Sequence, residues 1–178
     1  SLDLSACDSI QNVHGLANCT KLTKLDLSSS APSWNFTPRR RLNVDGLVNC
    51  TNLIELDLIG SSIQNVDKLA NCTKLTSLDL SACDSLQNVD GLANCTKITS
   101  LDLSDCDSLE NVDGLVNFSK LTSLELSGNS LSVPPTENEM GTRKQVAEYQ
   151  DKIRIFMALR DGNTNLIKDY KNSTSIDL

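Results

Sequence analysis

Acidic side chains recur in this 178-residue chain at positions that would place them in one row. Each stands between two leucines, and successive leucine–acid–leucine triplets begin 23, 31, 22, 23 and 23 residues apart. Alternating apolar and polar residues indicate a short strand with one buried face, so the acid of each triplet is expected to point outward. The row consists of Asp3, Asp26, Asp57, Asp79, Asp102 and Glu125.

Carboxylates on neighbouring strands, about 5 Å apart, repel each other by roughly 1 kcal/mol in water. A basic partner, bound cations or nearby serine hydroxyls would relieve this repulsion. Lys24 and Glu55 flank the row and are further contact candidates. We interpret the row as a surface for a protein partner that is basic or polar, and the simpler interpretation is that the acids are only solvated. Cation or glycan binding is a weaker alternative, because this face has no aromatic residues for stacking.

The seven cysteines do not have the spacing of a catalytic or metal-binding site. Their number is odd, no C-x-x-C pair occurs, and each occupies one of two recurring positions. One position continues with Phe118, which can neither coordinate a metal nor act as a nucleophile. We therefore expect buried, reduced thiols, which suggests a cytoplasmic protein. With one histidine, His14, and no P-loop, GxSxG or HExxH motif, we expect no enzyme, no metal and no cofactor.

A repeated unit of 22–23 residues must position these side chains. Its fullest copy, at residues 74–96, reads KLTSLDLSACDSLQNVDGLANCT. The pattern L-x-x-L-x-L-x-x-(N/C)-x-x-L over residues 1–133 resembles the leucine-rich repeat family. The V-D-G-L-A-N phrase is most similar to bacterial internalin-type repeats, and the cysteines are similar to cysteine-containing repeats. The resemblance implies an α/β right-handed solenoid of about six repeats, with short parallel strands on a concave face and short helices or 3-10 turns on a convex face.

Two further columns of polar residues are expected to satisfy main-chain groups. The resemblance implies hydrogen bonds from the residue after each strand to loop backbone, namely Cys7, Ser30, Ser61, Cys83, Cys106 and Asn129. Aspartates that precede a short apolar pattern are predicted to be helix N-caps, namely Asp45, Asp67, Asp90 and Asp113.

The second repeat contains an insertion within residues 28–41. It carries the single tryptophan of the chain, two prolines and three consecutive arginines. Insertions in solenoids form loops that often bind partners, and tryptophan and arginine are enriched in interface hot spots. The alternative is a tolerated loop whose tryptophan folds back on the solenoid. The contact residues predicted here are Trp34, Phe36, Arg39, Arg40 and Arg41.

After the repeats, residues 134–171 are predicted to form a helical cap and residues 172–178 a tail. An apolar stripe at helical spacing would cover the open end of the solenoid. The chain begins within a strand motif of the repeat, so we expect either a longer array or another molecule that covers the first strand. The stripe consists of Val146, Tyr149, Ile153, Phe156 and Met157.

Composition narrows the function further. The net charge of −7 and the pI of about 4.6 argue against nucleic-acid binding, which requires basic residues. No apolar run is long enough for a membrane span. The main hypothesis is a monomeric protein–protein interaction module, bacterial by resemblance, with a delivered effector that engages a host protein as one form of it. The alternative is a structural array that displays another domain.

Overall fold

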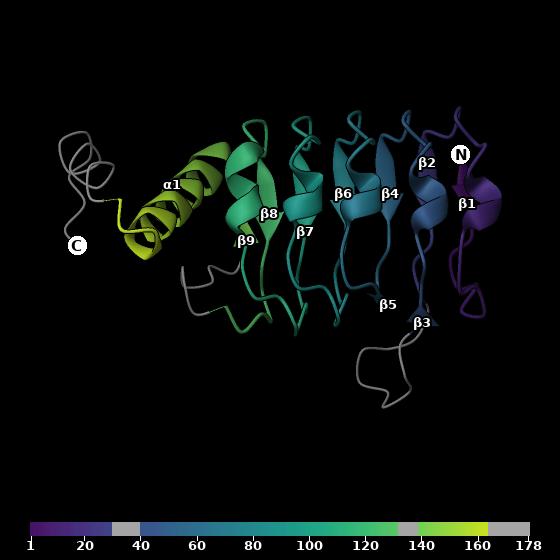
Figure 1. Cartoon of the computed structure of the whole chain (residues 1–178), viewed down its shortest axis with the longest axis horizontal. Coiled ribbons are helices and arrows are strands. Elements are labelled where there is room, and N and C mark those ends of the chain that lie inside the picture. Colours follow the sequence, from purple (N-terminus) through teal and green to yellow (C-terminus); the bar gives the residue numbers. More distant parts are fainter. Residues whose placement is uncertain (30–39, 132–138, 164–178) are drawn as a thin grey trace.

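The computed structural model describes residues 1–29, 40–131 and 139–163, in which successive repeats follow one another along a solenoid (Figure 1). Each repeat contributes one strand to a parallel sheet, and the strands are neighbours in chain order. This confirms the prediction of consecutive, side-by-side leucine strands. They are β1 (Leu2–Asp3), β2 (Lys24–Asp26), β4 (Glu55–Asp57), β6 (Ser77–Asp79), β7 (Ser100–Asp102) and β8 (Ser123–Glu125).

A 3-10 helix follows each strand of this sheet from β1 to β7. The final leucines of η2 to η4 and Leu115 within η5 are buried in the same core as the strand leucines, as the predicted α/β solenoid requires. Two short strands, β3 (Arg40–Arg41) and β5 (Ser61–Ser62), form a second, parallel sheet. The helices are η1 (His14–Leu16), η2 (Asp45–Leu47), η3 (Asp67–Leu69), η4 (Asp90–Leu92) and η5 (Asp113–Asn117).

The leucines of successive repeats share one continuous apolar core. Leu58, Leu80 and Leu103, the second leucines of their triplets, are 0% exposed. Burial of such a side chain stabilises the fold by about 1.5–3 kcal/mol. Phe118 and Tyr149 are the largest fully buried side chains. Because a single repeat cannot enclose its own leucines, each depends on its neighbours for stability.

Buried thiols connect each repeat to the one before it. Cys83 Sγ lies 3.4 Å from the Leu58 carbonyl oxygen, and Cys106 Sγ lies 3.2 Å from the Leu80 carbonyl oxygen. In the last repeat, Asn129 Nδ2 donates to the equivalent carbonyl at 2.8 Å. Burial raises the pKa of Cys106 to about 12, so this thiol is protonated and can donate.

The second cysteine position forms a similar column beside the 3-10 helices. Cys95 Sγ lies 3.4 Å from the carbonyl oxygen of Leu69 and 3.6 Å from that of Cys72. Burial is the main cause that raises the pKa of Cys72 to about 12. All seven cysteines are free; five are buried, Cys19 is half-buried and Cys7 is exposed. The buried thiols therefore serve as small interior residues that donate weak hydrogen bonds.

The aspartates expected as helix N-caps have a different role, so that prediction was wrong. Each is the first residue of its 3-10 helix, and the valine before it has no side-chain cap. The Asp45 N–H donates to Asn43 Oδ1 at 2.7 Å, and the Asp90 N–H donates to Asn88 Oδ1 at 3.1 Å. The asparagine oxygen accepts because its side chain reaches the amide two residues further on.

Glycine allows neighbouring 3-10 helices to approach closely. A Cβ atom at Gly91 in η4 would lie 2.6 Å from the main-chain nitrogen of Asp67 in η3, which is closer than real Cβ contacts. Gly15 has the same motif position in η1, but nothing lies within 4 Å of its Cβ position. In η3 this position is occupied by Lys68.

The helix α1 (Arg143–Arg160) lies across the C-terminal end of the solenoid (Figure 1). Strand β9 (Glu139–Met140) pairs antiparallel with β8 and covers the edge of the sheet. Of the described helices, none is long and apolar enough to cross a lipid bilayer. In the predicted apolar stripe, Phe156 and Met157 are half-buried, and the buried residues are Val146, Tyr149 and Ile153.

Gln150 of α1 continues the pattern of interior donors. Its Nε2 donates to the carbonyl oxygen of Leu115 at 2.6 Å and to that of Phe118 at 3.2 Å. These carbonyls correspond to the pair that Cys95 contacts in an internal repeat. The helix α1 therefore supplies the donor that a further repeat would have supplied.

Replacement of Gln150 by leucine should lower the free energy of unfolding by about 2 kcal/mol or more, because two buried carbonyls lose their donor. Urea unfolding followed by circular dichroism measures this change. Lys144→Leu, on the exposed side of the same helix, should change the stability by less than about 0.5 kcal/mol. Equal effects of the two substitutions would contradict the role assigned to Gln150.

Alanine at Gly91 should destabilise the protein by about 1–3 kcal/mol, because the new Cβ atom meets main chain of the preceding helix. Gly15→Ala is the matched control, since its Cβ would point into open space. It should be neutral or stabilise by up to about 1 kcal/mol, because alanine reduces the entropy of the unfolded chain. Thermal melting of both variants provides the comparison, and a large loss at Gly15 would refute the close-approach explanation.

Candidate functional site

The acids of the predicted row lie on consecutive strands and form one continuous surface, here called the acidic column. Strand pairing places each acid directly beside the next, from Asp3 with Asp26 to Asp102 with Glu125. Neighbouring strands are about 4.8 Å apart. Asp3 is exposed and the other members are half-buried. The full column comprises Asp3, Asp26, Asp57, Asp79, Asp102 and Glu125.

One oxygen of each carboxylate is bound to the end of its own strand. Asp79 Oδ1 accepts from the Ser81 N–H at 2.9 Å and from the Ser81 hydroxyl at 2.7 Å. Asp102 and Ser104 repeat this arrangement at 2.8 Å and 2.6 Å. Within the described part of the chain, Oδ2 of these two aspartates accepts no hydrogen bond. The serines therefore orient each carboxylate and leave one oxygen for a partner.

Asp57, in the middle of the column, has the least favourable environment for a charge. The residue two positions later is Ile59 rather than serine, so among the described residues Asp57 Oδ1 accepts only the Ile59 N–H, at 3.0 Å. Burial, followed by the nearby carboxylates of Asp79 and Asp26, raises the pKa of Asp57 to about 6. Burial also raises the pKa of Asp79, although its bonds with Ser81 oppose the shift. The free protein therefore carries an electrostatic cost at the centre of the column.

The N-terminal half of the column borders a shallow hollow of about 380 Å³. Lys24 and Glu55, both predicted as contact residues, line it and form an ion pair with Nζ and Oε1 2.7 Å apart. Their side chains are 56% and 47% exposed, and such a pair contributes less than about 1 kcal/mol. A partner can therefore replace this ion pair at little cost. Among the residues described, no group of three or more histidine, cysteine or acidic side chains is arranged to hold a metal ion.

The insertion residues are placed only in part. Trp34, Phe36 and Arg39 lie outside the described residues. Arg41 is exposed. Arg40 is only 8% exposed, so its side chain lies in the interior and not on the surface predicted for it.

The buried side chain of Arg40 donates hydrogen bonds to main-chain carbonyls at the start of the solenoid. Its guanidinium donates to the carbonyl of Cys7 at 3.1 Å, to the carbonyl of Leu27, and to the Ser61 hydroxyl at 3.1 Å. The Leu27 carbonyl corresponds to the one that Cys83 contacts in a later repeat. Arg40 therefore takes over a structural role that a thiol has elsewhere.

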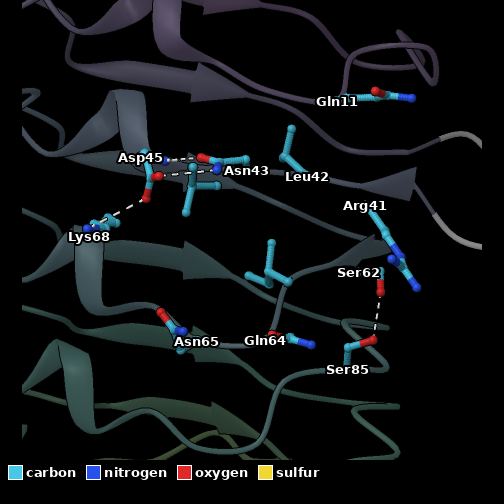
Figure 2. Close-up of a pocket in the computed structure, with 12 residues that line it drawn as sticks. Gln11, Arg41, Leu42, Asn43, Asp45, Ser62, Gln64, Asn65, Lys68 and Ser85 are labelled. Carbon is cyan, nitrogen blue, oxygen red and sulfur yellow. Dashed lines mark hydrogen bonds and ion pairs between the residues drawn. The ribbon is translucent and has the colours of Figure 1, made fainter.

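A second hollow, of about 620 Å³, lies between the second and third repeats beside η2 and η3, and we call it the interrepeat hollow (Figure 2). Its polar lining includes Arg41, Asn43, Gln64 and Lys68. Of these, sequence reasoning singled out only Arg41. The available signal was Lys68, which stands where the other copies of the motif have glycine.

Two adjacent copies of the repeat, residues 71–93 and 94–115, match a family model described as Leucine Rich repeat. A solved internalin of Listeria monocytogenes is similar at 26% identity and a TM-score of 0.51, over 68% of this chain and 39% of that protein. A leucine-rich-repeat protein of Leptospira interrogans is similar at 20% identity and a TM-score of 0.59, over 74% of this chain and 32% of that protein. The chain thus spans well under half the length of either structure. No curated protein matches it.

Asp57→Asn should raise the melting temperature near neutral pH, and this gain should shrink as the pH falls. The pKa of Asp57 is about 6 in the folded protein against 3.8 ordinarily, so folding favours its protonated form. That stabilisation is fully present below the ordinary pKa and is lost as the pH rises through about 6. Asparagine keeps an acceptor for the Ile59 N–H and carries no charge.

Melting temperatures of this variant and the wild type should be compared from about pH 4 to about pH 8. The difference should be largest at the upper end and close to zero at the lower end. Asp90→Asn, a substitution in η4 away from the column, serves as the control. A pH-independent difference for Asp57→Asn would disprove the environment described for Asp57.

Proposed function

We propose that this chain, a leucine-rich-repeat solenoid with internalin-like repeats, is a module that binds another protein through its acidic column. The observation that carries the proposal is the series of outward carboxylate oxygens that have no partner among the described residues. They recur on paired strands, so a partner meets a line of acceptors with fixed spacing. Solenoid proteins of this kind generally use their extended concave surface to bind protein partners.

The chemistry of the column favours a partner with a basic surface. Burial and mutual repulsion raise the pKa of Asp57, and a lysine or arginine placed between two carboxylates would offset that cost. Arginine suits this role because its guanidinium can donate two parallel hydrogen bonds to a carboxylate. The net charge of −7 would attract such a partner at long range and would repel nucleic acid.

The insertion is proposed to take part in binding, and the protein is proposed to be a bacterial monomer. Exposed Arg41, together with Trp34, Phe36 and Arg39, is proposed to add further contacts with the partner. The chain is proposed to act as a monomer, since β9 covers one edge of the sheet. The similarity to a Listeria internalin supports a bacterial origin, and an effector that engages a host protein is the finer form of this proposal. The buried free thiols suit a reducing compartment.

Charge reversal in the column tests the proposal. Proteins captured by the tagged wild-type chain are purified, and their dissociation constants for the wild type and for the variant Asp79→Lys/Asp102→Lys are measured by calorimetry. We expect the variant to bind such a protein about a hundredfold more weakly or worse, because close charge pairs at interfaces are strongly coupled. Wild-type binding should also weaken as salt is added.

The control Asp90→Lys/Glu110→Lys makes the same change in net charge away from the column and should retain the affinity within about threefold. Unchanged affinity of the column variant would exclude the column as the site. A second variant, in which residues 31–39 are replaced by a two-residue link, keeps Arg40 because of its interior hydrogen bonds. Loss of binding only in this second variant would assign the contact to the insertion.

A further inference from the structure

The interrepeat hollow has a structural cause in one residue. In the preceding and following helices, glycine at this position packs on the repeat before it. A Cβ atom would lie 1.9 Å from the Val13 carbonyl oxygen at Gly46, and 2.6 Å from the Asp67 nitrogen at Gly91. Lys68 carries a Cβ atom, so η3 cannot approach η2 as closely. The second and third repeats therefore separate on this side, while β2 and β4 remain paired in the sheet.

On the wall of the hollow, one main-chain donor has no partner among the residues that the structure describes. Between later repeats, the Gln87 N–H donates to the Gln64 carbonyl at 3.3 Å, and the Glu110 N–H donates to the Gln87 carbonyl at 2.8 Å. The Gln64 N–H is the corresponding donor toward the second repeat, and it forms no hydrogen bond with any described residue. The interrepeat hollow thus interrupts a ladder of backbone bonds that resumes with the next repeat.

Side-chain amides surround this interrupted ladder. Those of Gln11 and Gln64 line the interrepeat hollow and form no hydrogen bond with any described residue (Figure 2). The Asn43 amide also lines it but is held by Asp45. Asn65 Oδ1 accepts the Asp67 N–H at 3.3 Å, which leaves the Asn65 Nδ2 for a ligand. An amide side chain can donate and accept at once, as can each peptide unit of an extended chain. Extended peptides bind to proteins largely through main-chain hydrogen bonds. The Gln64 N–H, which has no partner among the described residues, can form one such bond.

The charges around the hollow are mainly positive. Lys68 Nζ lies 3.7 Å from Asp45 Oδ1, and both side chains are about half exposed, so this ion pair is weak (Figure 2). Arg41 is exposed, lines the interrepeat hollow, and forms no ion pair with any residue in the described ranges. The charged residues that line the hollow are Arg41, Lys68 and Asp45, so the lining has a net charge of about +1. The whole chain, by contrast, has a net charge of −7. A ligand with a carboxylate at the Arg41 end would be complementary.

We propose that the interrepeat hollow binds an extended peptide segment of a partner protein, with an acidic side chain of that segment on Arg41. The Gln64 N–H donates to a peptide carbonyl, the side-chain amides of Gln11, Gln64 and Asn65 bind neighbouring peptide units, and the Arg41 guanidinium donates to the carboxylate. This site does not depend on the acidic column, which has the opposite charge. A neutral saccharide could use the same amides but would gain nothing from the charge of Arg41.

The test uses the full chain and a phage-displayed library of random peptides. The library is selected on the wild-type chain after depletion on Lys68→Gly, in which η3 can approach η2. We expect the enriched peptides to share an acidic residue. Synthetic copies should bind with affinities, measured by fluorescence anisotropy, that fall roughly tenfold or more with Arg41→Gln, and equally when that acidic residue is replaced by its amide.

Two further readouts locate the binding. In ¹⁵N spectra the peptide should shift the side-chain amide signals of Gln11, Gln64 and Asn65. Gln87 occupies the position equivalent to Gln64 in the next repeat, where the backbone bond between repeats is formed. Gln87→Ala should therefore leave the affinity within about twofold. Lys68→Gly should lose the peptide but keep a basic partner of the acidic column, so either proposal can fail alone.

Several outcomes would overturn this site. They are the absence of enriched peptides, equal binding to wild type and Arg41→Gln, and amide shifts caused only by a panel of neutral oligosaccharides. If Lys68→Gly fails to fold, as judged by circular dichroism, Arg41→Gln and Asn65→Ala still decide the question, because both residues are exposed.

Discussion

The fold depends on the supply of hydrogen-bond donors to main-chain carbonyls that each repeat leaves inside the solenoid. A buried carbonyl without a donor costs about 1–3 kcal/mol. Every repeat must therefore meet one requirement, a hydrogen-bond donor for the equivalent carbonyl. In the internal repeats Cys83 meets it with a thiol, and in the last repeat Asn129 meets it with an amide. Arg40 and Gln150 meet it at the insertion and at the end of the array. Four different side chains thus serve one physical requirement.

The same regularity explains the charge pattern of the surface. Because the leucines and the donors fix the register of successive repeats, equivalent outward positions lie side by side. A residue type that recurs at such a position therefore forms a continuous column. In the acidic column, burial and then the neighbouring carboxylates raise the pKa of Asp57, so the charged column raises the free energy of the unbound protein. Hydrogen bonds such as those from Ser81 to Asp79 reduce the cost without occupying the second carboxylate oxygen. The column is therefore held in one orientation before any partner arrives, which lowers the entropic cost of binding.

Much of this arrangement could be predicted from the sequence because the period of the repeat determines which residues become neighbours. The strands, their order, the leucine core and the alignment of the acids all follow from that period. The roles of Asn43 and Asp45 could not be separated, because both residue types accept hydrogen bonds and the helix is only three residues long. The interior position of Arg40 depends on the path of the backbone, which three identical neighbouring arginines do not reveal. The effect of Lys68 depends on how tightly residues such as Gly91 pack, which is a matter of tenths of an ångström.

The way in which α1 closes the array has an evolutionary consequence. Gln150 donates to the carbonyls of Leu115 and Phe118, and further hydrogen bonds from α1 to the solenoid reach residues 113–119. Among the described residues, α1 therefore forms its hydrogen bonds with the last repeats. An internal unit such as Lys74–Thr96 donates hydrogen bonds to main-chain carbonyls of the preceding unit. It presents the equivalent carbonyls to the unit that follows. Gene duplication can therefore lengthen the molecule without any redesign of its terminus. Each added copy would extend the contact line by one carboxylate, and reach and affinity could evolve together in steps of one unit.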